Sequence, residues 1–117
     1  MVTKDPREPF SRLTAQEAKE KLDAGTAVMI DVRDPDEYAE IHAEGVRLIP
    51  VNTVINEAKQ IRSYAGDKKE VLFICKSGAR SALAAEYATA AGIDDLELFN
   101  VEGGTDGWAA DGLPTGD

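Results

Sequence analysis

The 117-residue sequence predicts an α/β fold, with a central parallel sheet that carries helices on both faces. Short apolar runs alternate with helical stretches along the chain, as in folds built from successive strand–helix units. These runs are apolar at nearly every position, which is typical of parallel strands buried on both faces. A chain of this length is expected to form one domain, residues 11–117, after a flexible polar lead-in of residues 1–10.

The first predicted elements are a helix and a buried strand. Thr14 and Glu17 have the spacing of a capping box, so a helix is expected to start there and run to about Asp23. Gly25 is placed to end this helix, because glycine readily adopts the left-handed conformation of a C-cap. The apolar run at residues 27–32 is the first predicted strand.

Two further helices are predicted from their starting residues. A short helix is expected at Asp34, because Pro35 suits the first helical position. A longer helix is expected to start at Asn52 or Thr53 and to continue through Ala65, since apolar residues recur on one of its faces. The remaining predicted elements are strands at residues 46–49, 70–74 and 96–101, a helix ending near residue 91, and a short helix at 105–110.

The composition excludes several classes of function. A net charge of −9 repels nucleic acid backbones and anionic membranes, so neither is an expected partner. No apolar run is long enough to cross a membrane and no secretory signal is recognisable, which predicts a cytoplasmic protein. With one cysteine and one histidine the chain can form no internal disulfide, and we expect neither a metal nor another cofactor.

The lone cysteine, Cys75, stands where the apolar run 70–74 ends and a polar loop begins. A helix is predicted directly after the loop, so backbone N–H groups and the helix dipole are expected to converge near the sulfur. A thiol in this setting ionises more readily, and the thiolate is the nucleophilic form. A lone cysteine can also be a small buried apolar residue, but the basic loop favours catalysis. The expected site comprises the catalytic Cys75 and a substrate-binding loop of Lys76, Ser77, Gly78, Ala79, Arg80 and Ser81.

Two physical properties of this loop are predicted. Gly78 allows the chain to curl tightly with its N–H groups facing inward. The pKa of Cys75 is expected to lie below that of free cysteine because of these N–H groups, the helix N-terminus, and the charges of Lys76 and Arg80.

The segment from Cys75 to Ser81, Cys-Lys-Ser-Gly-Ala-Arg-Ser, resembles the active-site loop of single-domain rhodaneses, which are sulfurtransferases. Three further segments resemble the other signatures of that family and follow in the same order. They are residues 31–38, residues 42–46 with 49–50, and residues 102–108 with 112–114. The resemblance covers about residues 12–115 and implies the rhodanese-like fold.

The resemblance also implies a reaction. The Cys75 thiolate takes a sulfane sulfur from a small donor, thiosulfate or a persulfide, and holds it as a persulfide until a thiol or cyanide accepts it. One alternative is a sulfur carrier that partner proteins of a sulfur relay load and unload. Another is a phosphatase or arsenate reductase of the same fold, but those enzymes have one residue more than the four between Cys75 and Arg80. A non-catalytic binding module is disfavoured because the cysteine is present.

Several other polar or aromatic residues have competing structural explanations. His42 is expected to be structural rather than a general base. Asp31 is expected to pair with Arg33 or a backbone N–H rather than to tune the site. Trp108 can be a buried core residue or can line the pocket. Lys76 can be a solvated surface lysine or can attract the substrate.

Overall fold

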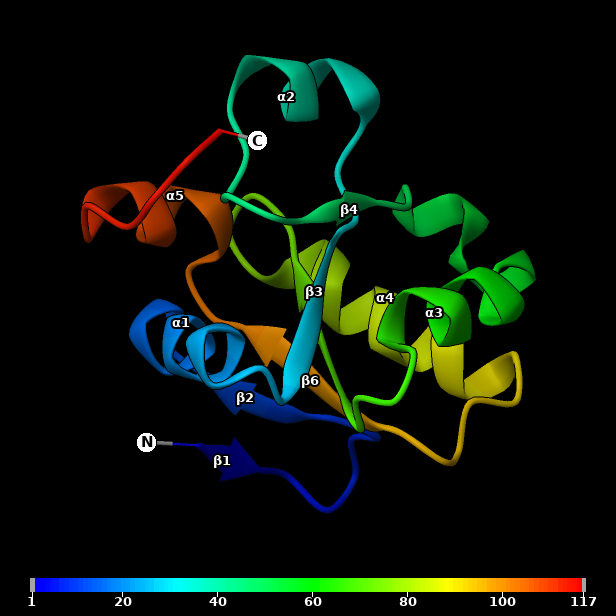
Figure 1. Ribbon diagram of the computed structural model, residues 1–117. Coiled ribbons are helices and arrows are strands. Elements are labelled where there is room, and N and C mark those ends of the chain that lie inside the picture. Colours follow the sequence, from blue (N-terminus) through cyan, green and yellow to red (C-terminus); the bar gives the residue numbers. More distant parts are fainter. Residues whose placement is uncertain (1, 117) are drawn as a thin grey trace.

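A computed structural model describes residues 2–116, and within them six strands form one sheet in the order β1-β2-β6-β5-β3-β4 (Figure 1). Every neighbouring pair is parallel except the edge pair β1 and β2, which is antiparallel. The predicted α/β fold with a central parallel sheet is therefore confirmed. The strands are β1 (Thr3–Lys4), β2 (Ser11–Leu13), β3 (Ala27–Asp31), β4 (Arg47–Leu48), β5 (Glu70–Ile74) and β6 (Glu97–Val101).

The helices begin where the capping signals predicted, with one exception described below. The Thr14 hydroxyl accepts a hydrogen bond from the Glu17 N–H at 3.1 Å, and the Glu17 carboxylate accepts one from the Thr14 N–H at 2.9 Å. Gly25 ends this first helix with φ +75°. The helical elements are α1 (Ala15–Ala24), α2 (Pro35–Glu40), the 3₁₀ helix η1 (Val51–Asn56), α3 (Ala58–Ala65), α4 (Ala79–Ala90) and α5 (Gly104–Ala110).

The single helix predicted from residue 52 or 53 through residue 65 is wrong in its first half. The chain forms the 3₁₀ helix η1 there, and α3 starts only at Ala58. The Thr53 N–H bonds to the Pro50 carbonyl and the Glu57 N–H bonds to the Val54 carbonyl, which is the three-residue spacing of a 3₁₀ turn. Val54 is fully buried. The Thr53 hydroxyl also donates to the Pro50 carbonyl, at 2.8 Å, so a side-chain bond reinforces the tighter turn that the apolar pattern does not reveal.

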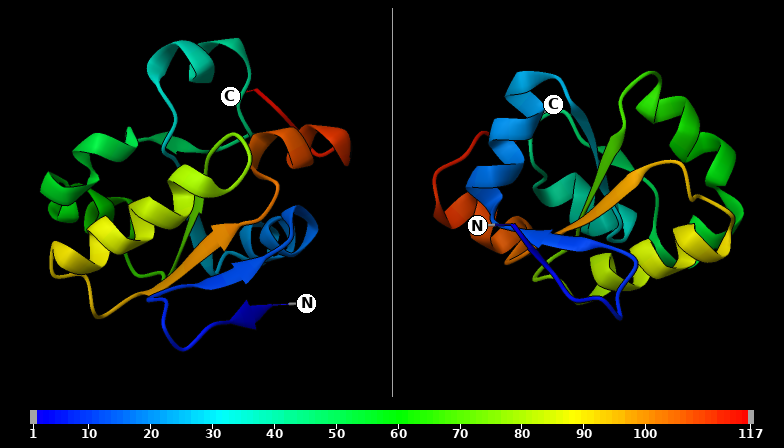
Figure 2. Two further views of the ribbon diagram at one scale, coloured as in Figure 1. Left: turned by 180° about the vertical axis from the view of Figure 1, so that it is seen from behind. Right: turned by 90° about the horizontal axis from the view of Figure 1, so that it is seen from below.

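The sheet separates two apolar clusters, and the helices cover both faces (Figures 1 and 2). Along β5, Val71 and Phe73 belong to the cluster under η1, α3 and α4, together with the following Cys75. Leu72 and Ile74 belong to the other cluster, under α1 and α5. This alternation places Cys75 on the α4 side of the sheet, because successive side chains of a strand point to opposite faces.

The amino-terminal stretch pairs with the sheet edge. Strand β1 pairs with β2, and Phe10 is only 2% exposed within the core. Neither strand was predicted, because the short polar run Ser11–Leu13 carries no strand-like apolar pattern. The flexibility expected of residues 1–10 stays a prediction, and Met1 and Asp117 lie outside the described residues.

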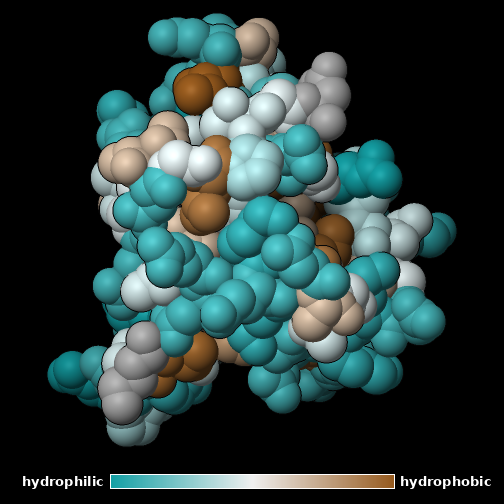
Figure 3. Space-filling view, turned by 60° about the vertical axis from the view of Figure 1, so that its left-hand side comes forward, coloured by the Kyte–Doolittle hydropathy of each residue, from teal (hydrophilic) through white to brown (hydrophobic). Residues whose placement is uncertain are grey.

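The outer surface is largely polar. Figure 3 shows hydrophilic side chains over most of one face, with apolar side chains in small separate patches. Across residues 2–116, no helix has the length and apolar character needed to span a membrane.

Candidate active site

Cys75 directly follows the last residue of β5, at the edge of the sheet where the parallel strands end. Three residues separate it from α4, whose first residue is Ala79. In open α/β sheets this edge is where ligands bind. Cys75 is nevertheless 1% exposed, so its sulfur lies beneath the loop rather than on the surface.

The Cys75 sulfur is surrounded by hydrogen-bond donors of the loop. The Gly78 N–H lies 2.9 Å from Sγ, and the Ser81 hydroxyl oxygen lies 3.4 Å from it. The backbone N–H groups of Ser77 and Ser81 also lower the pKa of the thiol. Burial raises the pKa of the Cys75 thiol. The hydrogen bonds, led by that of the Ser81 hydroxyl, together lower it by more than burial raises it. The net result is a pKa below the ordinary value, so the site favours the thiolate.

The curled loop depends on Gly78. Its φ of +118° lies in the region that residues with side chains rarely adopt, and this conformation turns its N–H toward the sulfur. The predicted curl is confirmed. Two hollows adjoin the loop, with volumes of about 240 Å³ and 570 Å³. The first is lined by Arg33, Glu37, Glu40, Ile41, Lys76 and Asp106, and the second by Arg12, Ser77, Gly78, Ala79, Ala82, Asn100, Glu102 and Gly103.

Both cations of the loop are bound to carboxylates. The Arg80 guanidinium makes two hydrogen bonds to Glu37 of α2, at 2.7 and 2.9 Å. The Lys76 ammonium lies 3.1 Å from the carboxylate of Asp106, and both of these side chains are 61% exposed. The expected contribution of the loop N–H groups to the lowered Cys75 pKa is confirmed, and hydrogen bonds rather than the charges of Lys76 and Arg80 are the larger influences that lower it.

The Asp31 carboxylate is paired, as predicted. Asp31 is fully buried at the end of β3, and its carboxylate accepts hydrogen bonds from the Arg33 side chain at 2.8 to 3.1 Å and from the Arg33 N–H at 3.0 Å. Arg33 also donates to the Ile41 carbonyl at 2.5 Å. This buried pair fixes the chain that leads from β3 into α2, and thereby the position of Glu37 opposite Arg80.

Comparison with known proteins assigns the family. The Rhodanese-like domain family matches residues 14–111, which is most of the chain. The chain belongs to the rhodanese-like domain family. It is also 37% identical over 100 residues to the probable adenylyltransferase/sulfurtransferase MoeZ of Mycobacterium tuberculosis. That match covers 85% of this chain but 24% of the relative, so the chain spans about a quarter of the length of the curated relatives it matches.

Solved structures agree with this assignment of the fold. A rhodanese-related protein from Thermoplasma volcanium is 28% identical, with a TM-score of 0.74, over 90% of this chain and 96% of that one. A thiosulfate sulfurtransferase from Pseudomonas aeruginosa is 27% identical, with a TM-score of 0.73, over 90% of this chain and 20% of that one. The predicted family resemblance and fold are thus confirmed.

Trp108 and His42 of this rhodanese-like domain have structural roles. Trp108 is 1% exposed and donates its indole N–H to the Pro114 carbonyl at 2.6 Å, so it anchors the carboxyl-terminal tail in the core. The His42 ring stacks on Tyr38 with 3.9 Å between the ring centroids, and His42 Nδ1 lies 2.7 Å from the Tyr38 carbonyl oxygen. Both residues therefore secure the structure around the site instead of contacting the sulfur.

Three residues that contact the Cys75–Ser81 segment escaped the sequence-based prediction of the site. Glu37 belongs to a segment that resembles the family, but its pairing with Arg80 links positions 43 residues apart. Gly104 packs against the backbone of Cys75 and Lys76. Asn100 is a buried polar residue in β6 that bonds to the loop. An asparagine at the end of an apolar strand was the available signal for it.

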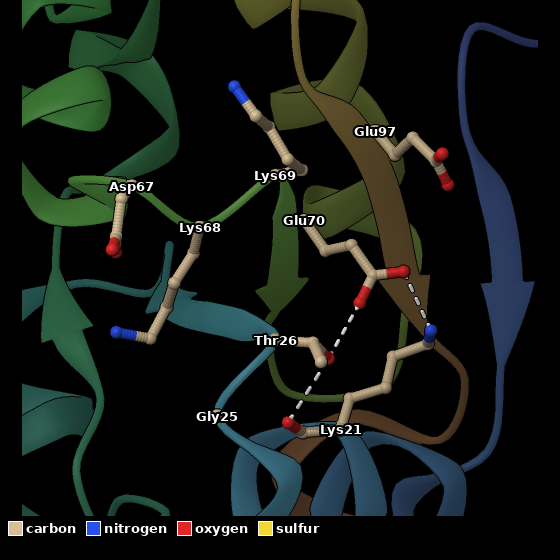
Figure 4. Close-up of a pocket in the computed structure, with 8 residues that line it drawn as sticks. All are labelled: Lys21, Gly25, Thr26, Asp67, Lys68, Lys69, Glu70 and Glu97. Carbon is tan, nitrogen blue, oxygen red and sulfur yellow. Dashed lines mark hydrogen bonds and ion pairs between the residues drawn. The ribbon is translucent and has the colours of Figure 1, made fainter.

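A further hollow of about 550 Å³ lies at the other end of the parallel strands, where β3, β5 and β6 begin (Figure 4). Three of its lining residues bond to one another, because the Glu70 carboxylate accepts hydrogen bonds from Lys21 and Thr26, at 2.8 and 2.9 Å. Within residues 2–116, no group of three or more His, Cys, Asp or Glu side chains is arranged to hold a metal ion.

Proposed function

We propose that this domain is a sulfurtransferase that carries a sulfane sulfur on Cys75. The thiolate attacks the outer sulfur of a donor such as thiosulfate, and a thiophilic acceptor, a thiol or cyanide, then removes that sulfur. The observation that carries the proposal is the set of loop N–H groups and the Ser81 hydroxyl that surround a single sulfur and favour its anionic form. Membership of the rhodanese-like family supports it.

The two steps balance without an external oxidant. In the first, a Cys75 lone pair forms a sulfur–sulfur bond to the outer sulfur of thiosulfate, and sulfite leaves with the electron pair of the broken bond. In the second, the acceptor attacks the outer sulfur, the bond to Sγ breaks, and its electron pair regenerates the Cys75 thiolate. The chain has one cysteine, so a second internal thiol cannot discharge the persulfide.

The proposed substrate-binding loop is Lys76–Ser81, with Cys75 at its base. Preorganised N–H groups stabilise an anion without having to reorient, as in an oxyanion hole. Because Cys75 is almost fully buried, the site suits a donor that delivers one projecting sulfur atom. A phosphate ester needs room for a tetrahedral group, and Arg80 is already bound to Glu37.

A sulfur carrier is the second candidate. It uses the same Cys75 persulfide, but partner proteins of a sulfur relay load and unload it. The observation that favours it is the relative named as an adenylyltransferase/sulfurtransferase, in which the matching segment is about a quarter of a longer protein. Under this proposal a protein persulfide loads Cys75 faster than thiosulfate does.

The proposed activity is tested by thiocyanate formation from thiosulfate and cyanide. We expect turnover by the native protein and a fall to the uncatalysed rate in Cys75→Ser, whose hydroxyl is far less nucleophilic. Persistent turnover in Cys75→Ser would exclude the proposed nucleophile.

Loading rates with thiosulfate and with a persulfide donor, compared side by side, separate the enzyme from the carrier. Aryl phosphate serves as a further substrate, and Cys75-dependent phosphate release at a comparable rate would contradict the assignment.

A further inference from the structure

Asn100 joins the Cys75 loop to the interior of the sheet. It is 1% exposed in β6, and its amide bonds to two loop groups. Its Nδ2 donates to the Gly78 carbonyl at 3.1 Å, and its Oδ1 accepts from the Ser81 hydroxyl at 2.5 Å. Because a carbonyl can only accept, the nitrogen of the amide must face Gly78. The amide oxygen therefore faces Ser81.

The Ser81 hydroxyl has more acceptors in reach than it has hydrogens. Its oxygen lies 2.5 Å from Asn100 Oδ1, 3.1 Å from the Gly78 carbonyl oxygen and 3.4 Å from Cys75 Sγ. A hydroxyl has one hydrogen and can donate it to one of these acceptors at a time. The Asn100 oxygen is the nearest. While the hydroxyl donates to Asn100, it does not donate to the sulfur.

We propose that Asn100 is a positioning residue that holds the Ser81 hydroxyl hydrogen while the Cys75 sulfur is uncharged and releases it to Sγ when that sulfur becomes a thiolate. The hydroxyl rotates and no proton leaves it. A thiolate is a stronger acceptor than a neutral amide oxygen, because hydrogen bonds to ionised groups are roughly twice as strong as neutral ones. Asn100 therefore opposes thiolate formation to a limited extent.

The role of Asn100 during turnover rests on the proposed function. In the persulfide the negative charge is on the outer sulfur and Sγ carries two covalent bonds, so the Ser81 hydroxyl returns to Asn100. When the acceptor removes the outer sulfur, the electron pair of the broken bond arrives on Sγ. The hydroxyl then turns to Sγ and stabilises the departing thiolate. Asn100 Oδ1 and Cys75 Sγ thus accept the hydrogen bond of the Ser81 hydroxyl in turn.

The proposal is tested by thiolate absorbance against pH, which needs no sulfur donor and is independent of the proposed function. We expect Asn100→Leu to lower the Cys75 pKa by about one unit, because the hydroxyl no longer has to leave an amide oxygen. Ser81→Ala alone should raise the pKa. In the Ser81→Ala background, Asn100→Leu should cause no shift, because Asn100 acts through the hydroxyl. A merely structural role for Asn100 would move the pKa alike in both backgrounds.

The charged groups around the site are the same in these variants: Asp31, Arg33, Glu37, Lys76, Arg80 and Asp106. An unchanged or raised pKa in Asn100→Leu, or an equal shift with and without the Ser81 hydroxyl, would overturn the proposal. If Asn100→Leu does not fold, Asn100→Asp replaces it. Its carboxylate holds the hydroxyl more strongly, so the pKa should rise, and the rise should shrink when Ser81 is alanine. An equal rise in both backgrounds would contradict the proposal.

Discussion

Gly104 packs its backbone directly against the peptide of Cys75. A Cβ atom placed on Gly104 would lie 2.4 Å from the Cys75 carbonyl oxygen and 2.5 Å from the carbonyl atoms of Lys76. The next N–H, of Thr105, donates to that same Cys75 carbonyl at 2.7 Å, and the Asp106 N–H donates to the Lys76 carbonyl at 3.1 Å. The start of α5 therefore fixes the carbonyls of the residues at the base of the catalytic loop.

Gly104→Ala should disrupt the site and destabilise the fold. The added methyl meets backbone on two residues, which cannot move as a flexible side chain could, and φ is +56°. We expect a loss of about 3 kcal/mol or more in the free energy of unfolding. Denaturant unfolding measures this loss, and the thiosulfate–cyanide assay is expected to show a parallel loss of activity.

Gly112→Ala is the matched control. Gly112 also has positive φ, +72°, but nothing lies within 4 Å of the position of its Cβ. This variant should lose only about 1–2 kcal/mol, the cost of the left-handed conformation, and should keep its activity. Equal losses in the two variants would show that backbone conformation, not contact with Cys75, explains the effect.

Ser81→Ala should shift the pH dependence of sulfur uptake to higher pH. Uptake requires the thiolate, so its rate rises with pH through the Cys75 pKa and then levels off. The Ser81 hydroxyl lowers that pKa, and its removal should raise the midpoint by about half to one unit. Ser77→Ala is the control, because Ser77 acts on the sulfur through its backbone N–H, which alanine retains. The account of thiol activation fails if both variants keep the native midpoint.

Glu37→Gln should change how stability depends on acid. Hydrogen bonds from Arg80 and from the Asp34 N–H lower the Glu37 pKa from 4.5 to about 2. Because the pKa is lower in the folded state, the stabilisation is complete above pH 4.5 and is lost as the pH falls toward 2. The native protein should therefore exceed the variant in unfolding free energy at neutral pH, and the gap should narrow below pH 4.5. Parallel curves in urea unfolding from pH 7 to pH 2 would refute this.

Local signals in the sequence predicted most of the fold. Capping residues such as Thr14 set helix starts through bonds between near neighbours in the chain, and apolar runs marked the buried strands. Strand β2 was missed because it is three residues long with a single apolar side chain, Leu13, and takes its extended form from pairing with distant β6. The 3₁₀ turn at η1 was missed because the apolar pattern buries Val54 in either kind of helix and does not show the three-residue spacing of the backbone hydrogen bonds.

The same distinction applies to the candidate site. Cys75 and Gly78 were identifiable because a thiol at a strand end and a glycine in a tight loop are local features. The pairings of Arg80 with Glu37 and of Ser81 with Asn100 depend on how α2 and β6 dock beside the loop. Distance in the sequence hides such contacts, so the carboxylate partners of Lys76 and Arg80 were not foreseen.

The central claim is that Cys75 takes up one sulfur atom, and intact mass spectrometry tests it most directly. After incubation with thiosulfate and desalting, the native protein should be heavier by one sulfur atom, and cyanide or a thiol reductant should remove the gain. Cys75→Ser should gain nothing under the same conditions. A native protein that never gains the atom, or a Cys75→Ser variant that gains it equally, would contradict the account.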